Sequence, residues 1–576
     1  MPRSSFCAKS EAEDVAGDSM EQGGPPDEPQ PQTDRGEMRT IVAASSAGTA
    51  FEWYDFFIFG ALAPIIGRQF TAGLNDTAGF IFALGAFAAG FFARPFGALV
   101  FGGIGDRLGR KGAFLVTITL MGLATLAVGF LPTYAQIGLA APILLIALRL
   151  IQGFALGGEY GGAAVYVAEH APVHRRGEYT GWIQISASLG LIGALGVIYV
   201  TRLIMGEAAF NAWGWRIPFL FSAFLLVISL YMRLKLDESP AFLRMKAEGT
   251  QSKAPYSEAF LRWRYLKVVL LALFAIMVAQ GALWYTAFFY SQFFMEKILK
   301  VDPKTVVLLM LAATVLSAPL YVFFAWLSDK VGRKPVMLFG MAVAALSFIP
   351  AFHMMTRYAN PDLANASERT PVIVVADPAS CSLQFDPVGK ATFTSSCDIA
   401  KATLANAGVS YRNQATLPGS TAFVQVGAAK VASVEGAGLP PAELARVRSD
   451  VEGRIKAALK AAGYPEKADP AKVNLLGLFG VLALFVLAAT ALYGPIAACL
   501  VELFPTRIRY TAMSVPYNIG TGWVGGFLPV TAFAMVAASG DIYFGLWYPM
   551  VAIILSLVVC VFLLPETRGR DLHAET

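Results

Sequence analysis

The chain has 576 residues, of which 56% are hydrophobic and only 15% are charged. Soluble domains carry about one quarter of charged residues, so this composition excludes an ordinary soluble protein. The net charge of +5 is modest, and the basic residues lie in loops between apolar runs, which does not indicate a nucleic-acid partner.

The chain opens with a polar segment and continues as a series of apolar runs. Residues 1–38 are rich in Glu, Asp, Gln, Pro, Gly and Ser without an apolar core, so we expect a disordered cytoplasmic tail and neither a signal peptide nor a lipid anchor. A membrane helix needs about 20 apolar residues. Such runs predict twelve helices, over 41–66, 78–103, 113–131, 137–160, 179–201, 215–233, 267–292, 304–327, 336–355, 473–500, 511–536 and 541–564.

These spans predict an all-α integral membrane protein with two six-helix halves and a small extracytoplasmic insert. The expected domains are the tail 1–38, the N-terminal half 39–233, a cytoplasmic linker 234–266, helices 7–9 over 267–355, the insert 356–472, helices 10–12 over 473–565 and a tail 566–576. Lys and Arg gather in the loops of one side, Arg233 among them, and the positive-inside rule makes that side cytoplasmic. We therefore expect a multi-pass protein of the inner membrane with both termini in the cytoplasm.

The insert contains a strand-like run at Val372–Ala376 and helix-like runs near 398–407 and 441–463. We expect either a small folded α/β cap or a partly ordered loop. Cys381 and Cys397 both lie in it, on the oxidising side, where a disulfide can form. The alternative is a pair of free thiols.

A polar loop at Gly102–Lys111, GGIGDRLGRK, is echoed at Ala325–Lys334, AWLSDKVGRK. Each copy carries an acid, Asp106 or Asp329, followed by a basic residue, a Gly and a basic pair, so the halves are related. The pattern resembles the signature loop of the major facilitator superfamily, a resemblance that covers most of residues 40–570 outside the insert. The second copy has Ala325 where the first has Gly102, which puts close helix packing there in doubt.

Several ionisable residues lie inside predicted helices, where they are costly and mark functional sites. Helix 1 holds Glu52 and Asp55, and helix 2 holds Arg94. Helix 4 holds Arg149, Gln152 and Glu159 within an arc of about 80°, which we expect to face a water-filled cavity. Gly153, Gly157 and Gly161 on helix 4 recur every four residues and allow a neighbouring helix to approach closely. The alternative for these charges is one structural ion-pair cluster.

The stretches EWYDFFIFG, ARPFG and RLIQGFALGGEYGGA resemble the metabolite:proton symporter branch of the superfamily. The resemblance implies symport of a small organic anion or zwitterion with protons. It makes Arg94 and Arg149 candidates to hold a substrate carboxylate, and Glu52, Asp55 and Glu159 candidates to carry the proton. Tyr54 and Gln152 complete the predicted substrate site in this half.

The second half has neutral polar and aromatic residues in its spans instead: Gln280, Trp284 and Tyr285 in helix 7, and Asn518 in helix 11. These suit the non-ionic part of a small substrate. Trp284 and Tyr285 also fit the hydrophobic core. A break of helix 11 at Pro516 would supply a hinge for alternating access.

A second group of charges lies in the cytoplasmic loops. Glu169 with Arg175 and Arg176 is echoed by Glu502 with Arg507 and Arg509, which suggests ion pairs between the halves that form in one state only. The predicted latch residues are Asp106, Arg107, Arg110, Asp329, Arg333, Glu169, Arg175, Glu502 and Arg507. In the family the first signature loop holds the outward-facing state.

No catalytic, metal or cofactor site is expected. His170 and His174 lack a third ligand, and neither a phosphate-binding Gly-Lys-Ser/Thr loop nor a Gly-x-Ser-x-Gly elbow is present in the sequence. We expect a monomeric secondary transporter driven by the proton gradient, with small-molecule, proton and lipid partners. The alternatives are an exporter or drug:proton antiporter of the same fold, whose Pro-containing motif helix 5 lacks, and a sensor that binds ligand through the insert.

Overall fold

The computed structural model describes residues 35–71, 76–235, 237–382, 394–570 and 572. Among them, eleven helices are long and apolar enough to span a membrane. The first predicted span lies in a twelfth long helix, α1 (Arg35–Phe70), of 36 residues. The predicted twelve-helix architecture is therefore confirmed, although α1 begins inside the segment expected to be a disordered tail.

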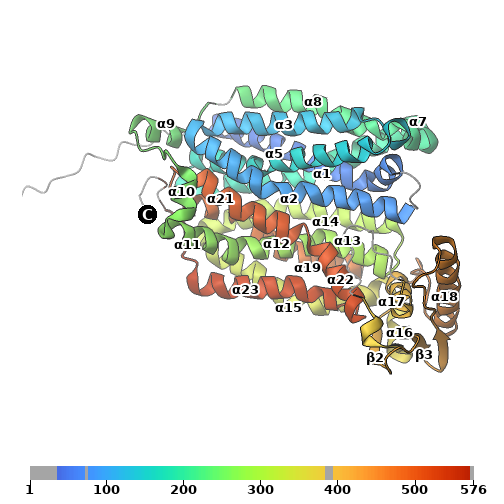
Figure 1. The fold of residues 1–576 in the computed structure, drawn as a ribbon. Coiled ribbons are helices and arrows are strands. Elements are labelled where there is room, and N and C mark those ends of the chain that lie inside the picture. Colours follow the sequence, from blue (N-terminus) through green and yellow to red (C-terminus); the bar gives the residue numbers. More distant parts are fainter. Residues whose placement is uncertain (1–34, 72–75, 236, 383–393, 571, 573–576) are drawn as a thin grey trace, which may run out of the picture.

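The N-terminal half forms the upper layer of Figure 1 and the C-terminal half the lower one. The upper layer contains α1, α2 (Asp76–Leu108), α3 (Arg110–Phe130), α4 (Tyr134–Ile137), α5 (Ala140–His170), α6 (Arg176–Gln184), α7 (Ser186–Ala209) and α8 (Arg216–Leu234). The short turns η1 (Val173–Arg175) and η2 (Phe210–Gly214) connect them.

The linker forms α9 (Pro240–Ala247) and α10 (Pro255–Leu261), and the C-terminal half follows. Its seventh span is bent through α11 (Trp263–Ala272), η3 (Leu273–Met277), α12 (Val278–Tyr285), η4 (Thr286–Tyr290), α13 (Ser291–Phe293) and η5 (Phe294–Ile298). The others are α14 (Pro303–Val331), α15 (Arg333–Ala359), α19 (Leu475–Tyr493) with α20 (Ile496–Leu503), α21 (Arg509–Asn518) with η7 (Ile519–Gly525) and α22 (Leu528–Ser539), and η8 (Phe544–Leu546) with α23 (Trp547–Leu563).

The sequence suggested a break of helix 11 at Pro516, but the structure shows no break there. Helix α21 runs through this proline, and the winding changes to a π-helical segment three residues later, at η7. π-Helical turns are rare and concentrate at functional sites. The irregular part of this span is therefore the glycine-rich η7.

Glycines let α2 and α5 cross in close contact. A Cβ at Gly153 would lie 1.9 Å from the Gly90 carbonyl oxygen, and one at Gly157 would lie 2.1 Å from that of Arg94. The predicted close approach is therefore confirmed at both positions. Gly161 instead faces Ser514 of the other half.

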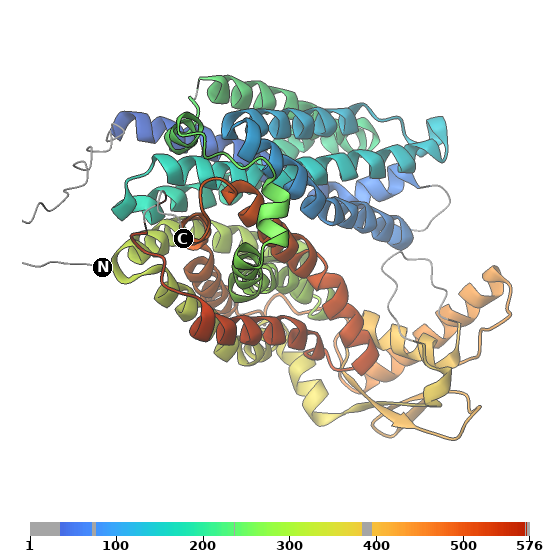
Figure 2. The same ribbon diagram turned by 60° about the vertical axis from the view of Figure 1, so that its left-hand side comes forward.

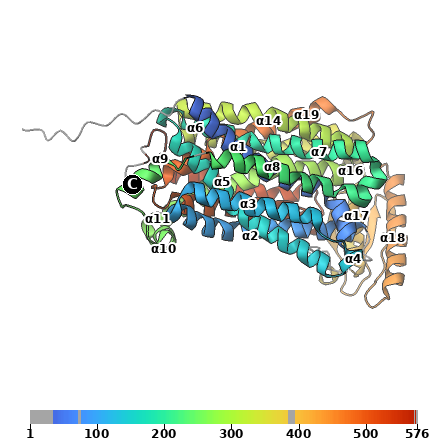
Figure 3. The same ribbon diagram turned by 90° about the horizontal axis from the view of Figure 1, so that it is seen from above.

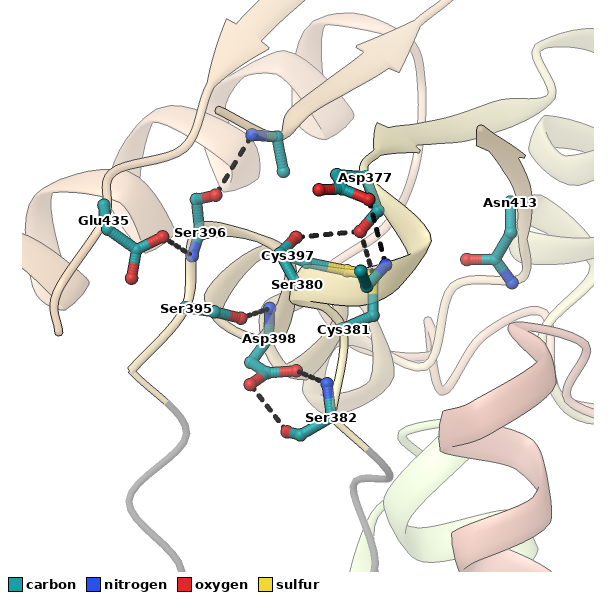
Figure 4. The surroundings of a disulfide bond; sticks show 12 residues. Asp377, Ser380, Cys381, Ser382, Ser395, Ser396, Cys397, Asp398, Asn413 and Glu435 are labelled. Carbon is teal, nitrogen blue, oxygen red and sulfur yellow. Dashed lines mark hydrogen bonds between the residues drawn. A yellow bond between two sulfur atoms is a disulfide. The ribbon is translucent and has the colours of Figure 1, made fainter. Parts of the chain in front are cut away.

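The insert folds as an α/β domain, with a four-stranded sheet in the order β2-β1-β3-β4. Strand β1 (Val372–Ala376) lies where the sequence predicts a strand; it pairs parallel to β2 (Tyr411–Ala415) and antiparallel to β3 (Phe423–Val426), which pairs with β4 (Ala429–Ala432). The helices are α16 (Pro361–Arg369), η6 (Pro378–Ser380), α17 (Ser396–Ala407) and α18 (Pro441–Ala461). A disulfide joins Cys381 to Cys397 (Figure 4).

The signature loops and the insert lie at opposite ends of the helix bundle. We call the end with the two signature loops the latch end and the end with the insert the insert end. Figure 3 shows α9, α10 and α11 at the left, on the latch end, and α17 and α18 at the right, on the insert end.

Candidate functional site

A buried polar cluster joins α1, α3 and α5 inside the N-terminal half. The Arg149 Nη1 atom donates to Asp55 Oδ2 at 3.2 Å and to Gln152 Oε1 at 2.8 Å. The Gln152 amide in turn donates to Asp55 Oδ1 at 3.1 Å and to Thr125 Oγ1 at 2.9 Å. Since these residues are at most 4% exposed, the charges face each other in a water-poor environment.

One edge of the Arg149 guanidinium is unused. Its Nε and Nη2 atoms are buried and have no hydrogen-bond partner among the described residues. The Phe59 ring lies against the face of the guanidinium, 3.4 Å from Cζ to the ring centroid. Two parallel N–H groups on one edge are the arrangement that binds a carboxylate through two hydrogen bonds.

A pocket of about 20 Å³ adjoins this cluster, enough for one water molecule. Its lining is Asp55, Phe56, Gly90, Phe91, Arg94, Arg149, Gln152, Gly153 and Leu156. These residues come from α1, α2 and α5, of which α2 and α5 cross in close contact at the glycines. The pocket thus brings together four predicted site residues: Asp55, Arg94, Arg149 and Gln152.

Glu52 lies beside this pocket and faces Arg94. The Arg94 Nη2 and Glu52 Oε1 atoms are 4.0 Å apart, and both side chains are 8% exposed. The second oxygen of Glu52 has no hydrogen-bond partner among the described residues. This ion pair is therefore loose, and one buried carboxylate oxygen remains open to a proton or another donor.

Glu159 lies apart from the pocket, which corrects the expectation that it shares a wet face with Arg149. It forms an ion pair with Arg233 of α8 and accepts from Thr117 Oγ1 at 3.1 Å. Arg233 is only 1% exposed, so it is not the loop residue that the sequence predicted. Gly48 makes room for it, because a Cβ there would overlap the guanidinium. Together with Thr117 of α3, the ion pair joins α3, α5 and α8 of one half.

Tyr54 was expected to bind substrate and instead belongs to the packing of its own half. Its hydroxyl donates to the Pro218 carbonyl of α8 at 2.7 Å, and its ring is 2% exposed. Side chains one residue apart point to different faces of a helix, and Asp55 faces the pocket while Tyr54 faces α8.

The predicted residues of the C-terminal half do not line the pocket. Trp284 Nε1 donates to Tyr321 OH at 2.9 Å, and its ring packs against Trp53 of the other half at 5.2 Å. The Tyr285 ring packs edge-on against the Phe91 ring, with their centroids 5.9 Å apart. Gln280 Oε1 and Asn518 Oδ1 are buried acceptors with no hydrogen-bond partner among the described residues.

The signature-loop acids connect the two halves at the latch end. Asp106 accepts from the backbone of Tyr510 at 3.2 Å and of Thr511 at 2.9 Å, at the start of α21. Asp329 accepts from the backbone of Gly177 at 2.9 Å and of Glu178 at 2.7 Å, at the start of α6. Each carboxylate thus caps a helix N-terminus of the opposite half, where a negative charge is stabilising.

Two buried glutamates form a second symmetric layer. Glu169 pairs with Arg509 at 2.7 Å and Arg110 at 3.8 Å, and Glu502 pairs with Arg176 at 3.0 Å and Arg333 at 3.1 Å. Each glutamate therefore binds one arginine of its own half and one of the other. The predicted pairing between halves is present, with Arg176 and Arg509 as the arginines that cross.

Three predicted latch residues lie outside this layer. Arg175 pairs with Glu178, three residues away, and its side chain is 37% exposed. Arg507 pairs with Glu258 of the linker at 2.8 Å. Arg107 is exposed and lies over the Tyr256 ring at 5.6 Å.

The substitution of Ala325 for the signature glycine is compensated in the opposite helix. A Cβ at Gly102 would lie 2.7 Å from the Thr511 Cα, so this position needs glycine. In the other copy, Gly181 of α6 provides the space, since a Cβ there would lie 2.5 Å from that of Ala325. Close packing is kept at both crossings.

Sequence reasoning missed Thr125, Phe59 and Arg233. Thr125 gave a weak signal as a polar residue in an apolar span, and Phe59 gave none. Among the described residues, no group of three or more His, Cys, Asp or Glu side chains is placed to hold a metal ion.

The comparisons with known proteins agree with this architecture. The model of the family described as "Sugar (and other) transporter" matches residues 40–258, 245–367 and 458–575. The proline/betaine transporter of Escherichia coli K12 is 34% identical over 326 residues, which cover 55% of this chain and 65% of that protein. The chain therefore matches slightly less than two thirds of that relative's length.

Two further relatives match over different lengths. The Escherichia coli K12 shikimate transporter is 35% identical over 54% of this chain and 72% of its own. The glycine betaine/proline/ectoine/pipecolic acid transporter OusA of Dickeya dadantii is 26% identical over 94% of this chain and 86% of its own.

The fold is also found among solved structures. The proton:xylose symporter XylE bound to 6-bromo-6-deoxy-D-glucose aligns with a TM-score of 0.60 at 16% identity, over 93% of this chain and 98% of that one. At this identity the likeness shows the fold alone. The relatives named above are transporters and not enzymes. The chain therefore belongs to the sugar (and other) transporter family of the major facilitator superfamily.

Proposed function

We propose that this protein is a symporter that carries a small carboxylate or zwitterion together with protons across the inner membrane. The observation that carries the proposal is the cluster of Asp55, Arg149 and Gln152, in which an acid and a guanidinium share a pocket and part of the guanidinium is unused. The basic loops support an orientation with the latch end in the cytoplasm and the insert outside.

Coupling follows from competition for Arg149. While Asp55 is ionised, it holds one nitrogen of the guanidinium at 3.2 Å. When a proton neutralises Asp55, this attraction is lost. The Arg149 charge is then uncompensated, and its affinity for a substrate carboxylate at the free edge rises. Substrate and proton therefore stabilise each other in the site, which is the thermodynamic requirement for symport.

The remaining donors and acceptors suit the rest of a small substrate. Glu52 and the open oxygens of Gln280 and Asn518 can accept from an ammonium or hydroxyl group once the two halves part. The family relatives include proteins named for proline, betaine and shikimate, and each of these solutes carries a carboxylate. These are the first probes to use.

Transport itself requires the two ends to open in turn. In the present state the latch end is closed by Asp106, Asp329 and the layer of Glu169 and Glu502. Opening toward the cytoplasm breaks the contacts that join opposite halves. These are the backbone hydrogen bonds of Asp106 and Asp329 and the ion pairs Glu169–Arg509 and Glu502–Arg176. The membrane potential supplies about 2.3 kcal/mol per charge per 100 mV to drive the cycle.

The test is proton movement in proteoliposomes with a pH-sensitive dye inside. Addition of proline, glycine betaine or shikimate outside should acidify the lumen at a rate that saturates with solute. Alkalinisation on addition of solute would instead indicate an antiporter. Binding of solute without any uptake would favour a sensor.

A further inference from the structure

The insert is attached to the membrane helices through the backbone as well as through side chains. The Tyr411 N–H donates to the Gly540 carbonyl at 2.7 Å, and the Ala468 N–H donates to the Lys300 carbonyl at 3.1 Å. Gly540 follows α22, and Lys300 follows η5. The two contacts therefore reach the insert-end turns of spans 11 and 7.

Side chains reinforce both contacts. Asn413 donates to the Ser539 carbonyl at 2.9 Å, and the Lys300 ammonium donates to the Asn406 carbonyl at 2.6 Å. The insert thereby touches the same two turns at two points each. All these contacts lie on the C-terminal half, and Figures 1 and 2 show the insert beyond that half's helix ends.

Left-handed backbone conformations gather at this junction. Lys300 has a φ of 57°, which is uncommon for a residue with a side chain. Gly408 and Gly540 have φ values of 71° and 82°, and a Cβ on either would press into the junction: 2.1 Å from the Ile298 carbonyl oxygen, or 2.5 Å from that of Tyr411. Such conformations persist where surrounding contacts fix them.

The insert is itself well braced. Its start and end meet where the Asn474 N–H donates to the Tyr358 carbonyl at 2.8 Å. The Cys381–Cys397 disulfide and the bonds from Ser382 to Asp398, at 2.6 and 2.9 Å, tie η6 to α17 (Figure 4). A body fixed in this way can transmit a constraint from one turn to the other.

Spans 7 and 11 contain π-helical turns, at η3, η4 and η5 in span 7 and at η7 in span 11. They also carry Gln280 and Asn518. We propose that the insert is a rigid brace that ties the insert-end turn of span 7 to that of span 11, so that both ends move as one body. The irregular middle segments then adjust around the substrate while their ends stay fixed.

The chain offers matched variants to test the brace. Gly408→Ala introduces a clash with Ile298, whereas Gly419→Ala, at a φ of 76° and with nothing within 4 Å, introduces the same backbone strain in open space. Gly540→Ala and Gly438→Ala form a second pair, both at a φ of 82°, of which only the first meets the junction.

The first readout is the distance between spin labels at Lys304→Cys and Ala538→Cys, in a background without Cys7, Cys499 and Cys560. Wild type and the two control variants should give one narrow distribution. Gly408→Ala and Gly540→Ala should broaden it about twofold, since the turns are then released from each other. The Cys381–Cys397 bridge, scored by thiol labelling, should remain formed in all variants, because the clashes lie at the junction.

The second readout, which rests on the proposed transport function, is uptake of proline, betaine or shikimate. The junction variants should lower the maximal rate about fivefold at an unchanged half-saturation concentration. Equal distance distributions in a junction variant and its control would overturn the brace. A broadened distribution with no uptake of any solute by wild type would uphold the brace and reject the cargo assigned above.

Discussion

The two halves of the molecule are alike at the latch end and different inside. At the latch end each half offers an aspartate to a helix of the other and a glutamate to two arginines. Inside, the N-terminal half contains the ion pairs of Asp55, Glu52 and Glu159 with arginines. The corresponding part of the C-terminal half presents hydroxyls, amides and indole groups, such as Trp284 and Gln280.

This difference separates two tasks. In the proposed cycle the latch closes and opens as a unit, and the equal contacts on both halves suit this movement. In the proposed symport, substrate and Asp55 compete for Arg149, and the N-terminal half holds Asp55 and Arg149 within hydrogen-bonding distance. In the proposed mechanism the C-terminal half is an uncharged surface opposite this site, and the proposed brace lies on that half.

The largest expected effect concerns stability within the charged half. Glu159→Gln leaves the buried Arg233 without its counter-ion, which should cost about 3–5 kcal/mol and lower the unfolding temperature in detergent. The double variant with Arg233→Met should recover much of this loss. Glu178→Gln is the control, because its partner Arg175 is 37% exposed. If Glu159→Gln is stable and abolishes proton coupling, Glu159 is a coupling residue after all.

The second largest effect is expected for Arg149→Lys. A lysine ammonium keeps the charge but loses the edge with two parallel donors, so uptake of a carboxylate solute should fall about 100-fold. Initial uptake rates at low solute concentration measure this effect. Arg175→Lys, outside the site, should leave the rates unchanged. Full activity of Arg149→Lys would make Arg149 a structural residue.

The latch offers a smaller test of the symmetry. Gly181→Ala places a methyl group against Ala325, which should cost about 1–3 kcal/mol of packing at the latch and open that end. Ala325→Gly in the same chain should restore closure, since it returns the arrangement found at Gly102. Thiol accessibility of a cysteine placed at the latch end reports opening. Failure of the rescue would show that Gly181 has another role.

How far the sequence predicts this molecule depends on the kind of residue. The spans could be predicted because the bilayer forces long apolar runs, and β1 because it is an unbroken run of small and branched residues. Strands β2 and β4 could not, because they are short and largely exposed at the edges of a small sheet. Arg233 looked like a loop residue because it stands at the end of a span, and only the fold shows that Gly48 receives it.

The sequence also could not distinguish between arginines that lie close together in the chain. The sequence offered Arg175 beside Arg176 and Arg507 near Arg509, and only helix phase decides which one crosses to the other half. The compensation of Ala325 by Gly181 joins residues far apart in the chain. A single sequence contains no sign of such a pairing.

The smallest expected effect is a pH dependence at the latch. Burial by itself would raise the pKa of Glu566, but backbone N–H groups of Arg568, Arg333, Lys334 and Thr567 lower it below its ordinary value of 4.5. Because the pKa of Glu566 is lower in the folded state than in the unfolded state, the carboxylate stabilises the fold above pH 4.5. This stabilisation is lost as the pH falls through the folded-state pKa. Glu566→Gln should cost about 0.5 kcal/mol at pH 7, since the side chain is exposed, and less at pH 3. Unfolding temperatures at the two pH values measure the difference.

The most direct test of the central claim is the number of protons moved per solute in proteoliposomes containing wild type or Asp55→Asn. If Asp55 releases Arg149 when it takes up a proton, the variant should still exchange labelled solute across the membrane but should neither move protons nor accumulate solute against a gradient. Undiminished proton movement with Asp55→Asn would contradict the account, because the proton would then travel on another group.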